Sequence, residues 1–317
     1  MILLYAKGRN KTVKYYAGID IGGTNIKTGI VDELGNIISE DSVPTGADRP
    51  QEVVLQDIIS SVQESIAKAQ VQPSAVGMGS PGLIDSVNGI VKYNNNLGWH
   101  DFAIGPEMSR ALGIYSTLEN DADAAALGEV VAGCAKGANS AMIITLGTGV
   151  GSGYVVDEKI VRGCEFGHMV IHYGGRPCTC GRKGCFEAYC SATGLINMTR
   201  EAIAENPGGI MAKIADVEGT VSGHTVFDAA QEGDENAVNV IDTYTSYLAC
   251  GLANLINGLQ PEVIGIGGGI GKQGERLLAP LRLKVQHEIY PGIPLPRIVS
   301  CTLGYKAGLI GAAMAAK

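Results

Sequence analysis

The chain has 317 residues, of which 45% are hydrophobic, and its formal net charge at pH 7 is −8. This length is enough for two domains with sizeable cores, and the negative charge argues against a partner with a phosphate backbone such as DNA or RNA. No apolar stretch reaches about 18 residues, so we expect no transmembrane helix. The apolar run 1–6 lacks the cleavage site of a secretory leader. We therefore expect a cytoplasmic enzyme without a nucleic-acid or membrane partner, whose eight cysteines are reduced.

The first glycine-rich loop lies in 15–31, which reads YYAGIDIGGTNIKTGIV. A short apolar strand ends at Asp20, turns through Gly22, Gly23 and Thr24, and returns as a second apolar strand. Backbone N–H groups in a glycine turn can line an anion, and a carboxylate can hold Mg²⁺ or its water shell beside a phosphate. Taken alone, the segment is equally well interpreted as an ordinary β-hairpin.

A second segment repeats this pattern. Residues 141–156 run from an apolar strand through Gly147, Thr148 and Gly149 into another apolar strand. Two related strand–loop–strand units in one chain indicate a duplicated architecture, and we expect a nucleotide to bind in a cleft between its halves.

A third glycine cluster occupies 265–271 and contains Gly268 and Gly269. It follows a strand-like run and precedes a helical pattern at 272–288, which places a helix N-terminus beside the loop. A glycine run of this kind is weak evidence for a phosphate site when taken alone. It is stronger evidence here because it is the third loop in the chain that could hold an anion.

Strands and helices alternate along the chain. Apolar residues recur at helical spacing in 51–69, and a strand-like run follows at 75–79. Further helices are expected at 186–204 and 235–259, and a helix of small residues at 305–316. This alternation favours an α/β fold with largely parallel strands in each half.

The most specific motif lies in 163–187. His168 is followed by Cys178, Cys180 and Cys185 within the run CTCGRKGC. One imidazole and three thiols are the ligand set of a closed tetrahedral Zn²⁺ site, and the glycines between them permit a tight turn. Disulfides would need a secretory context that the sequence lacks. The remaining cysteines are expected to be packing residues: Cys134, Cys164, Cys190, Cys250 and Cys301.

An acidic segment, ENDADAAALGE, leads into an alanine-rich helix that is expected to end near Ala132. Asp121 or Asp123 could serve only as the N-cap of this helix. Alternatively, one of these carboxylates acts as a general base that takes the proton from a hydroxyl as it attacks phosphorus. Phosphoryl transfer depends mainly on positioning and charge stabilisation, so a single aspartate with Mg²⁺ would suffice.

Taken together, these motifs resemble the ROK family of sugar kinases over nearly the whole chain, and within it the zinc-containing bacterial glucokinases. The motifs that carry the resemblance are DIGGTNIKTGIV at 20–31, GSPGLID at 79–85, NNLGW at 95–99, ENDADAAALGE at 119–129, LGTGVGSG at 146–153, EFGHM at 165–169 and CTCGRKGCFEAYCSATG at 178–194.

The resemblance implies the two-lobed actin/Hsp70/hexokinase ATPase fold, built from duplicated ribonuclease H-like domains. We expect a smaller lobe formed by 1–118 with 305–317, and a larger lobe, 119–304, that carries the zinc loop. The larger lobe is also expected to form the interface of a homodimer or of a dimer of dimers. The expected reaction is ATP-dependent phosphorylation of a hexose at its 6-hydroxyl, with glucose as the first candidate, as in glycolysis.

The resemblance also implies roles for individual residues. Asp121 falls on the catalytic base and Asn120 on a sugar ligand beside it, while Asn96 and the backbone at Gly82 match further sugar contacts. ATP, with Mg²⁺ near its phosphates, is expected at Asp20, Gly22, Gly23, Thr24, Gly147, Thr148, Gly149, Gly268 and Gly269.

In the cysteine-rich segment, Glu165, His168 and Glu187 fall on positions that bind sugar hydroxyls, a task for which carboxylates are suited. His168 would also be a zinc ligand, so the resemblance implies a structural Zn²⁺ that anchors the loop presenting both glutamates. His172 is an alternative ligand, which the resemblance disfavours.

One position departs from the pattern. Family members often carry lysine directly after the GGT motif, whereas this chain has Asn25 there and Lys27 two residues later. A direct contact between Lys27 and phosphate is therefore not assigned.

Three alternatives bear on function. The family includes repressors with a DNA-binding unit ahead of the first glycine loop, and 19 residues before Asp20 are too few for such a unit. A kinase for N-acetylmannosamine, N-acetylglucosamine, fructose or allose stays open, because one or two hydrogen bonds decide between sugars. An actin-like filament or chaperone ATPase would not need the Glu/His/Cys segment.

Overall fold

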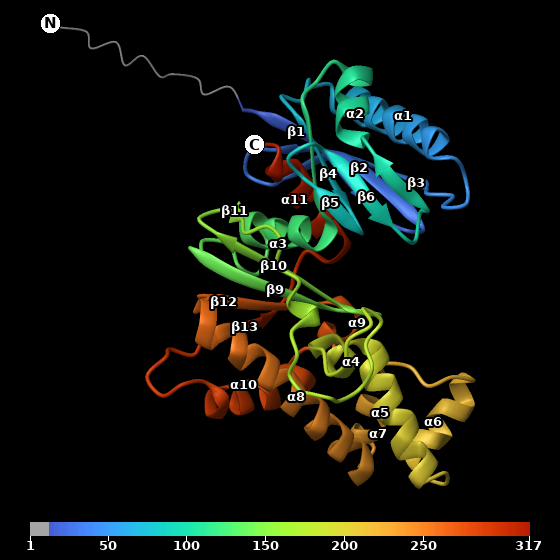
Figure 1. The fold of residues 1–317 in the computed structure, drawn as a ribbon, viewed down its shortest axis with the longest axis vertical. Coiled ribbons are helices and arrows are strands. Elements are labelled where there is room, and N and C mark those ends of the chain that lie inside the picture. Colours follow the sequence, from blue (N-terminus) through green and yellow to red (C-terminus); the bar gives the residue numbers. More distant parts are fainter. Residues whose placement is uncertain (1–12) are drawn as a thin grey trace, which may run out of the picture. The chain divides into compact units, whose positions relative to one another are not determined.

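The computed structural model describes residues 13–317, so the apolar run 1–6 lies outside the described part (Figure 1). The chain divides into two compact units. The first comprises Met1–Glu119 with Ala312–Lys317, and the second comprises Asn120–Gly311. No helix within 13–317 is long and apolar enough to cross a membrane.

The first unit is built on a five-stranded sheet in the order β3-β2-β1-β4-β8. Its first three strands form an antiparallel meander, and β4 lies parallel to β1 on the other side. The strands are β1 (Tyr15–Ile21), β2 (Asn25–Asp32), β3 (Ile37–Pro44), β4 (Val76–Ser80) and β8 (Ser116–Asn120).

Helices and a small sheet complete this unit. Helix α1 (Gln51–Ala69) packs on β2 and β3, and its stripe of Val54, Ile58 and Val62 is buried as its spacing predicts (Figure 1). The end of α11 (Ala307–Ala315) approaches β4 so closely that a side chain at Gly77 would overlap the carbonyl of Ala312. The other elements are α2 (Ile104–Leu112), β5 (Leu83–Asp85), β6 (Ile90–Asn94) and β7 (Trp99–Phe102).

The second unit repeats the same sheet, in the order β11-β10-β9-β12-β13. Again three consecutive strands are antiparallel, and the first of them lies parallel to a later strand. The strands are β9 (Ser140–Leu146), β10 (Val150–Val156), β11 (Lys159–Ile160), β12 (Val263–Gly267) and β13 (Arg297–Ser300). The duplicated α/β architecture is therefore confirmed. The expectation of largely parallel strands in each half is wrong, because three of the five strands in each sheet form an antiparallel meander whose hairpins need only short turns.

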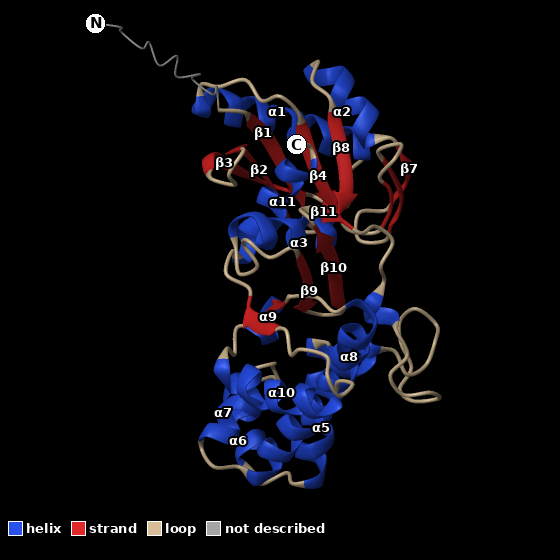
Figure 2. Ribbon diagram, turned by 90° about the vertical axis from the view of Figure 1, so that its left-hand side faces the viewer, coloured by secondary structure: helices blue, strands red, loops and turns tan. Residues whose placement is uncertain are grey.

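Helix α3 (Asp121–Ala132) covers one face of this second sheet, and a helical layer lies on the other face (Figures 1 and 2). The long helix α8 (Glu235–Leu259) buries Tyr244, Leu248 and Leu252 in that layer. The remaining helical segments are η1 (Phe166–His168), α4 (Phe186–Cys190), α5 (Ala192–Glu205), α6 (Ile210–Glu218), α7 (Thr225–Gln231), α8 (Glu235–Leu259), α9 (Gly268–Gly271), α10 (Glu275–Glu288), η2 (Gly304–Lys306) and α11 (Ala307–Ala315).

Two expected helices differ from those observed. The single helix expected at 186–204 is interrupted at Ser191, whose hydroxyl accepts a hydrogen bond from Gly194 N–H and so caps a new helix, α5. The helix expected from 272 begins at Glu275, because Gly274 has a φ of +57° and breaks the helical path after the short α9.

Candidate functional site

The first glycine loop, Gly22–Thr24, is a tight turn that a buried threonine holds in place. Gly22 N–H donates to Asn25 O at 3.1 Å, and a Cβ at Gly22 would lie only 2.7 Å from that oxygen. Thr45 has no exposed surface. Its hydroxyl donates to Gly22 O at 2.6 Å, and its N–H donates to Thr24 O at 2.9 Å. Thr45, which the sequence analysis did not identify, thus fixes the loop from the end of β3.

Asp20 faces Lys27 across the hairpin. The two residues are register partners in β1 and β2, and Lys27 Nζ lies 3.6 Å from Asp20 Oδ2. Burial raises the pKa of Asp20, and the lysine opposes this shift. The sequence analysis assigns Lys27 no contact with phosphate and does not predict its partner. A hairpin closed by Gly22 and Asn25 places position 27 opposite position 20, so the pairing of Lys27 with Asp20 could have been predicted from the sequence.

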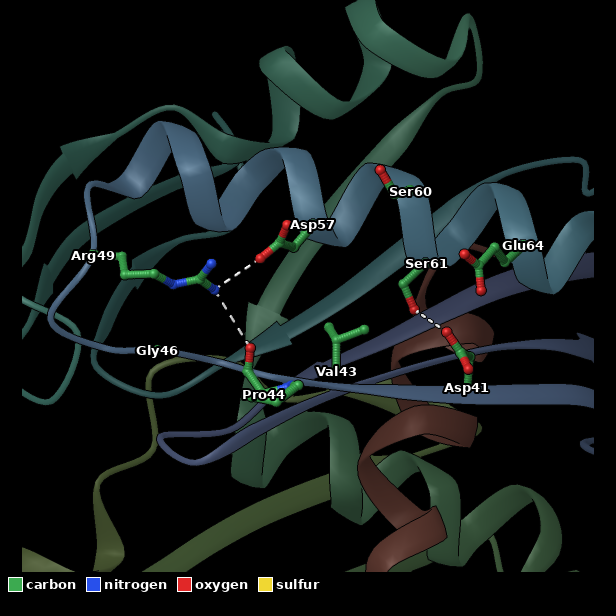
Figure 3. Close-up of a pocket in the computed structure, with 9 residues that line it drawn as sticks. All are labelled: Asp41, Val43, Pro44, Gly46, Arg49, Asp57, Ser60, Ser61 and Glu64. Atoms are coloured by element: carbon green, nitrogen blue, oxygen red, sulfur yellow. Dashed lines mark hydrogen bonds and ion pairs between the residues drawn. The ribbon is translucent and has the colours of Figure 1, made fainter.

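A pocket of about 370 Å³ lies between α1 and the end of β3 (Figure 3). Its Arg49 forms an ion pair of 2.8 Å with Asp57 and donates to Thr45 O at 3.0 Å. The pocket therefore connects through Thr45 to the first glycine loop. None of its lining residues was predicted as a site residue: Asp41, Val43, Pro44, Gly46, Arg49, Asp57, Ser60, Ser61 and Glu64.

Two predicted sugar-contact positions, Gly82 and Asn96, are joined by Asn94. The Asn94 side chain is buried, donates from Nδ2 to Pro81 O at 2.9 Å, and accepts from Asn96 N–H at 3.0 Å. Gly82 has a φ of +102°, and a Cβ there would overlap Tyr93 O. The structure thus brings the two loops together, and Asn94 is the connecting residue that sequence analysis missed.

The start of α3 carries Asn120 and Asp121. Asn120 is the N-cap, because its Oδ1 accepts from Ala122 N–H at 2.9 Å and from Asp123 N–H at 3.3 Å. Asn120, and not Asp121 or Asp123, is therefore the N-cap, and Asp121 Oδ1 also accepts from Ala122 N–H at 2.9 Å. Asp121 occupies the first helical position, where the helix dipole stabilises a negative charge.

The second glycine loop is held by the start of α5. Gly147 N–H donates to Gly149 O at 3.0 Å, and Gly147 O accepts from Ala192 N–H at 2.7 Å. The hydroxyl of Thr193 donates to Thr148 O at 2.8 Å. Thr193 is therefore a further residue that positions this loop.

The third glycine cluster lies beside the second loop. Gly268 has a φ of +78°, and a Cβ there would overlap the carbonyl of Leu146, the last residue of β9. Gly269 follows in α9 with open space around it. The structure thus brings the second and third glycine clusters together.

Glu187, on α4, contacts both the second glycine loop and the cysteine-rich segment. Its Oε2 accepts from Val150 N–H at 3.0 Å, and its Oε1 accepts from the Thr179 hydroxyl at 3.1 Å. A Cβ at Gly149 would overlap Oε2, so only glycine allows this approach. A predicted sugar ligand and a predicted phosphate loop are therefore in direct contact.

The four predicted metal ligands converge. The ligand atoms of His168, Cys178, Cys180 and Cys185 all lie within 4.8 Å of one another. Cys180 Sγ is 3.6 Å from Cys185 Sγ, and Cys178 Sγ is 3.6 Å from His168 Nδ1. Donor atoms around a tetrahedral Zn²⁺ with bonds of about 2.3 Å to sulfur are separated by about 3.6–3.8 Å. The donor set and its spacing therefore suit such an ion.

His172 lies outside this ligand group. Its Nδ1 is 3.3 Å from the Tyr189 hydroxyl, and its ring stacks on Tyr189 and Tyr247. The Tyr189 hydroxyl also accepts from Arg176 N–H at 2.8 Å. Of the two histidines, only His168 is gathered with the cysteines.

Glu165 precedes the short helix η1 and is exposed. Its carbonyl accepts from His168 N–H at 3.0 Å, which ties its position to that of the predicted metal ligand. Gly167 between them is buried, and a side chain there would overlap Val150 O. The segment from Glu165 to His168 thus packs against the strand that leaves the second glycine loop.

Known proteins are similar to this chain over nearly its whole length. The profile of the ROK family matches residues 16–317. A glucokinase of Halalkalibacterium halodurans is 35% identical over 313 residues, which cover 94% of this chain and 93% of that protein. A glucokinase of Thermotoga maritima is 36% identical over 303 residues, covering 93% and 95%. A solved structure, the ROK family glucokinase from Streptomyces griseus in complex with glucose and AMPPNP, matches with a TM-score of 0.76 and 32% identity over 96% of this chain and 99% of that chain.

Proposed function

Because the chain belongs to the ROK family, we propose that it transfers the γ-phosphoryl group of ATP to the 6-hydroxyl of glucose. The observation that carries this proposal is the hydrogen bond between Glu187 and Val150 N–H. It joins a carboxylate suited to sugar hydroxyls to a glycine loop suited to phosphate, as a sugar kinase requires.

Asp121 is proposed as the general base. It lies at the first position of α3, where the helix dipole stabilises a negative charge, and Asn120 is the N-cap of the helix. Asp121 would take the proton from the 6-hydroxyl as its oxygen attacks phosphorus. Asn120 uses Oδ1 for the cap, so its amide N–H₂ can donate to a sugar oxygen.

Mg²⁺ and ATP are proposed at the glycine loops. Mg²⁺ when bound neutralises charge on the β- and γ-phosphates, and the carboxylate of Asp20 suits the ion or its water shell. Gly22, Gly23 and Thr24 in one unit would bind phosphate oxygens through backbone N–H groups. In the other unit the same role is proposed for Gly147, Thr148, Gly149, Gly268 and Gly269.

Zn²⁺ is proposed to bind His168, Cys178, Cys180 and Cys185 and to have a structural role. A closed set of four protein ligands leaves no position for a reacting water. The ion would stiffen the segment that carries Glu165 and Glu187, and so preorganise both carboxylates for sugar hydroxyls. In the other unit, Asn96 and the backbone at Gly82 are proposed to complete the sugar contacts.

An ADP-release assay with MgATP tests the function. The panel contains glucose, mannose, fructose, allose, N-acetylglucosamine and N-acetylmannosamine, and kcat/KM should be highest for glucose. A preference for an N-acetyl sugar would change the assigned substrate and leave the assignment as a sugar kinase unchanged. Absence of turnover with every sugar would overturn the proposal and favour a non-catalytic sugar sensor.

The lobe boundaries 1–118 with 305–317 and 119–304, the cytoplasmic location and the homodimer, or dimer of dimers, stay predictions. Sedimentation velocity with and without glucose tests the oligomeric state.

A further inference from the structure

A second cluster of metal-ligating side chains lies in the second unit, remote in sequence from the cysteine-rich segment. Ligand atoms of Glu129, Cys134 and Cys301 all lie within 4.8 Å of one another. Glu129 is near the end of α3, Cys134 follows that helix, and Cys301 follows β13. The proposed kinase chemistry uses none of them.

The carboxylate of Glu129 is buried, with 1% of the residue exposed. Its Oε1 accepts from the N–H groups of Thr302 and Leu303 at 3.0 and 2.8 Å, and its Oε2 accepts from Cys134 N–H at 2.8 Å. Within residues 13–317 no lysine, arginine or histidine forms an ion pair with it.

Buried charges in proteins are generally paired with an opposite charge or coordinate a metal. Metal-ligating carboxylates are themselves held by further hydrogen bonds. The backbone N–H donors around Glu129 fix its carboxylate in this way. Among the described residues, no positively charged side chain forms an ion pair with that carboxylate.

The two sulfur atoms lie against β12 at the two positions of that strand that carry glycine. A Cβ at Gly265 would lie 2.9 Å from Cys134 Sγ and 3.2 Å from Cys301 Sγ. A Cβ at Gly267 would lie 3.2 Å from Cys301 Sγ. Glycine at both positions of β12 therefore makes the space in which the thiols meet beside the carboxylate.

From this arrangement we propose that Glu129, Cys134 and Cys301 form a second metal site, which binds a soft divalent cation such as Zn²⁺. Thiolates select soft ions, and binding releases one proton from each thiol. The cation would supply the positive charge that pairs with the buried carboxylate of Glu129. It would also tie the end of α3, the helix that begins at Asp121, to the segment that follows β13. With only three protein ligands, the site is weaker than the four-ligand site and fills after it.

Titration with Cd²⁺ tests the site without measuring turnover. Metal-free protein kept under a non-chelating reductant is titrated while the ultraviolet thiolate-to-metal charge-transfer band is followed. We expect two Cd²⁺ equivalents for the wild type and one for the double variant Cys134→Ser, Cys301→Ser. Cys250→Ser, a half-buried cysteine outside both clusters, is the matched control and should keep two.

Two results would overturn the proposal. One is a wild type that binds a single equivalent, and the other is a double variant that still binds two. Because the double variant could fail to fold, ¹¹³Cd NMR of the wild type is the second measurement. It should give one resonance in the range of sites with three sulfurs and one nitrogen, and another in the range of sites with two sulfurs and oxygen. The ADP-release assay is separate, so failure of the kinase proposal is distinguishable.

Discussion

Glu187 Oε2 accepts a hydrogen bond of 3.0 Å from Val150 N–H, and this bond fixes α4 to the strand that leaves the second glycine loop. The other oxygen of the same carboxylate lies 3.6 Å from Cys178 Sγ, in the predicted metal cluster. The predicted metal loop and the proposed phosphate loop are thus linked through one side chain, the carboxylate proposed to bind the sugar. A substitution that displaces any one of these three parts should therefore displace the other two.

The first prediction concerns Gly149→Ala. The added methyl group would overlap Glu187 Oε2 and displace it from Val150 N–H. Loss of such a bond to a charged group costs about 1.5–3 kcal/mol, so kcat/KM for glucose should fall at least about tenfold. Steady-state kinetics measures this, with Gly258→Ala on α8, where a Cβ meets open space, as the control. Equal kinetics for Gly149→Ala and wild type would mean that the contact has no role in activity.

Much of the fold could be predicted because its signals are local. The alternation of strands with glycine turns identified both hairpins, and the apolar stripe of α1 identified that helix within 51–69. The break between α4 and α5 also has a local signal, since Ser191 is a good N-cap residue.

The residues that support the site were not predictable in the same way. Thr45 bonds to Gly22 across 23 positions, and Glu129 bonds to Thr302 across 173. No periodicity or motif connects residues at such separations, because only the folded sheet brings them together. Asn94 was adjacent to a recognised motif, and its role depends on Pro81 in another loop.

Asp121→Asn should lower kcat at least about a hundredfold, the usual contribution of a general base. The amide keeps the size of the side chain and cannot take the proton, so glucose binding measured by calorimetry should persist. Asp216→Asn, on the exposed surface of α6, controls for a simple loss of charge. Activity of Asp121→Asn within about tenfold of wild type would be too high for a missing base.

Thr45→Val should raise the KM for ATP by about tenfold while kcat for glucose changes less. Valine has the shape of threonine and leaves the carbonyl of half-buried Gly22 without its donor, which costs up to about 1–3 kcal/mol. Thr45→Ser retains the hydroxyl and should restore the KM. If both variants show the same KM, packing rather than the hydrogen bond positions the loop.

Zinc analysis of the purified protein should find one tightly held ion per chain, bound by His168, Cys178, Cys180 and Cys185. The weaker three-ligand site should lose its ion on dialysis. Cys180→Ser removes one thiolate and should release the tight ion, lowering the Tm because metal-binding energy contributes to folding. His172→Asn should keep the ion, since His172 packs beside the rings of Tyr189 and Tyr247, outside the ligand group. Full zinc content in Cys180→Ser, measured by inductively coupled plasma mass spectrometry, would require a different ligand set.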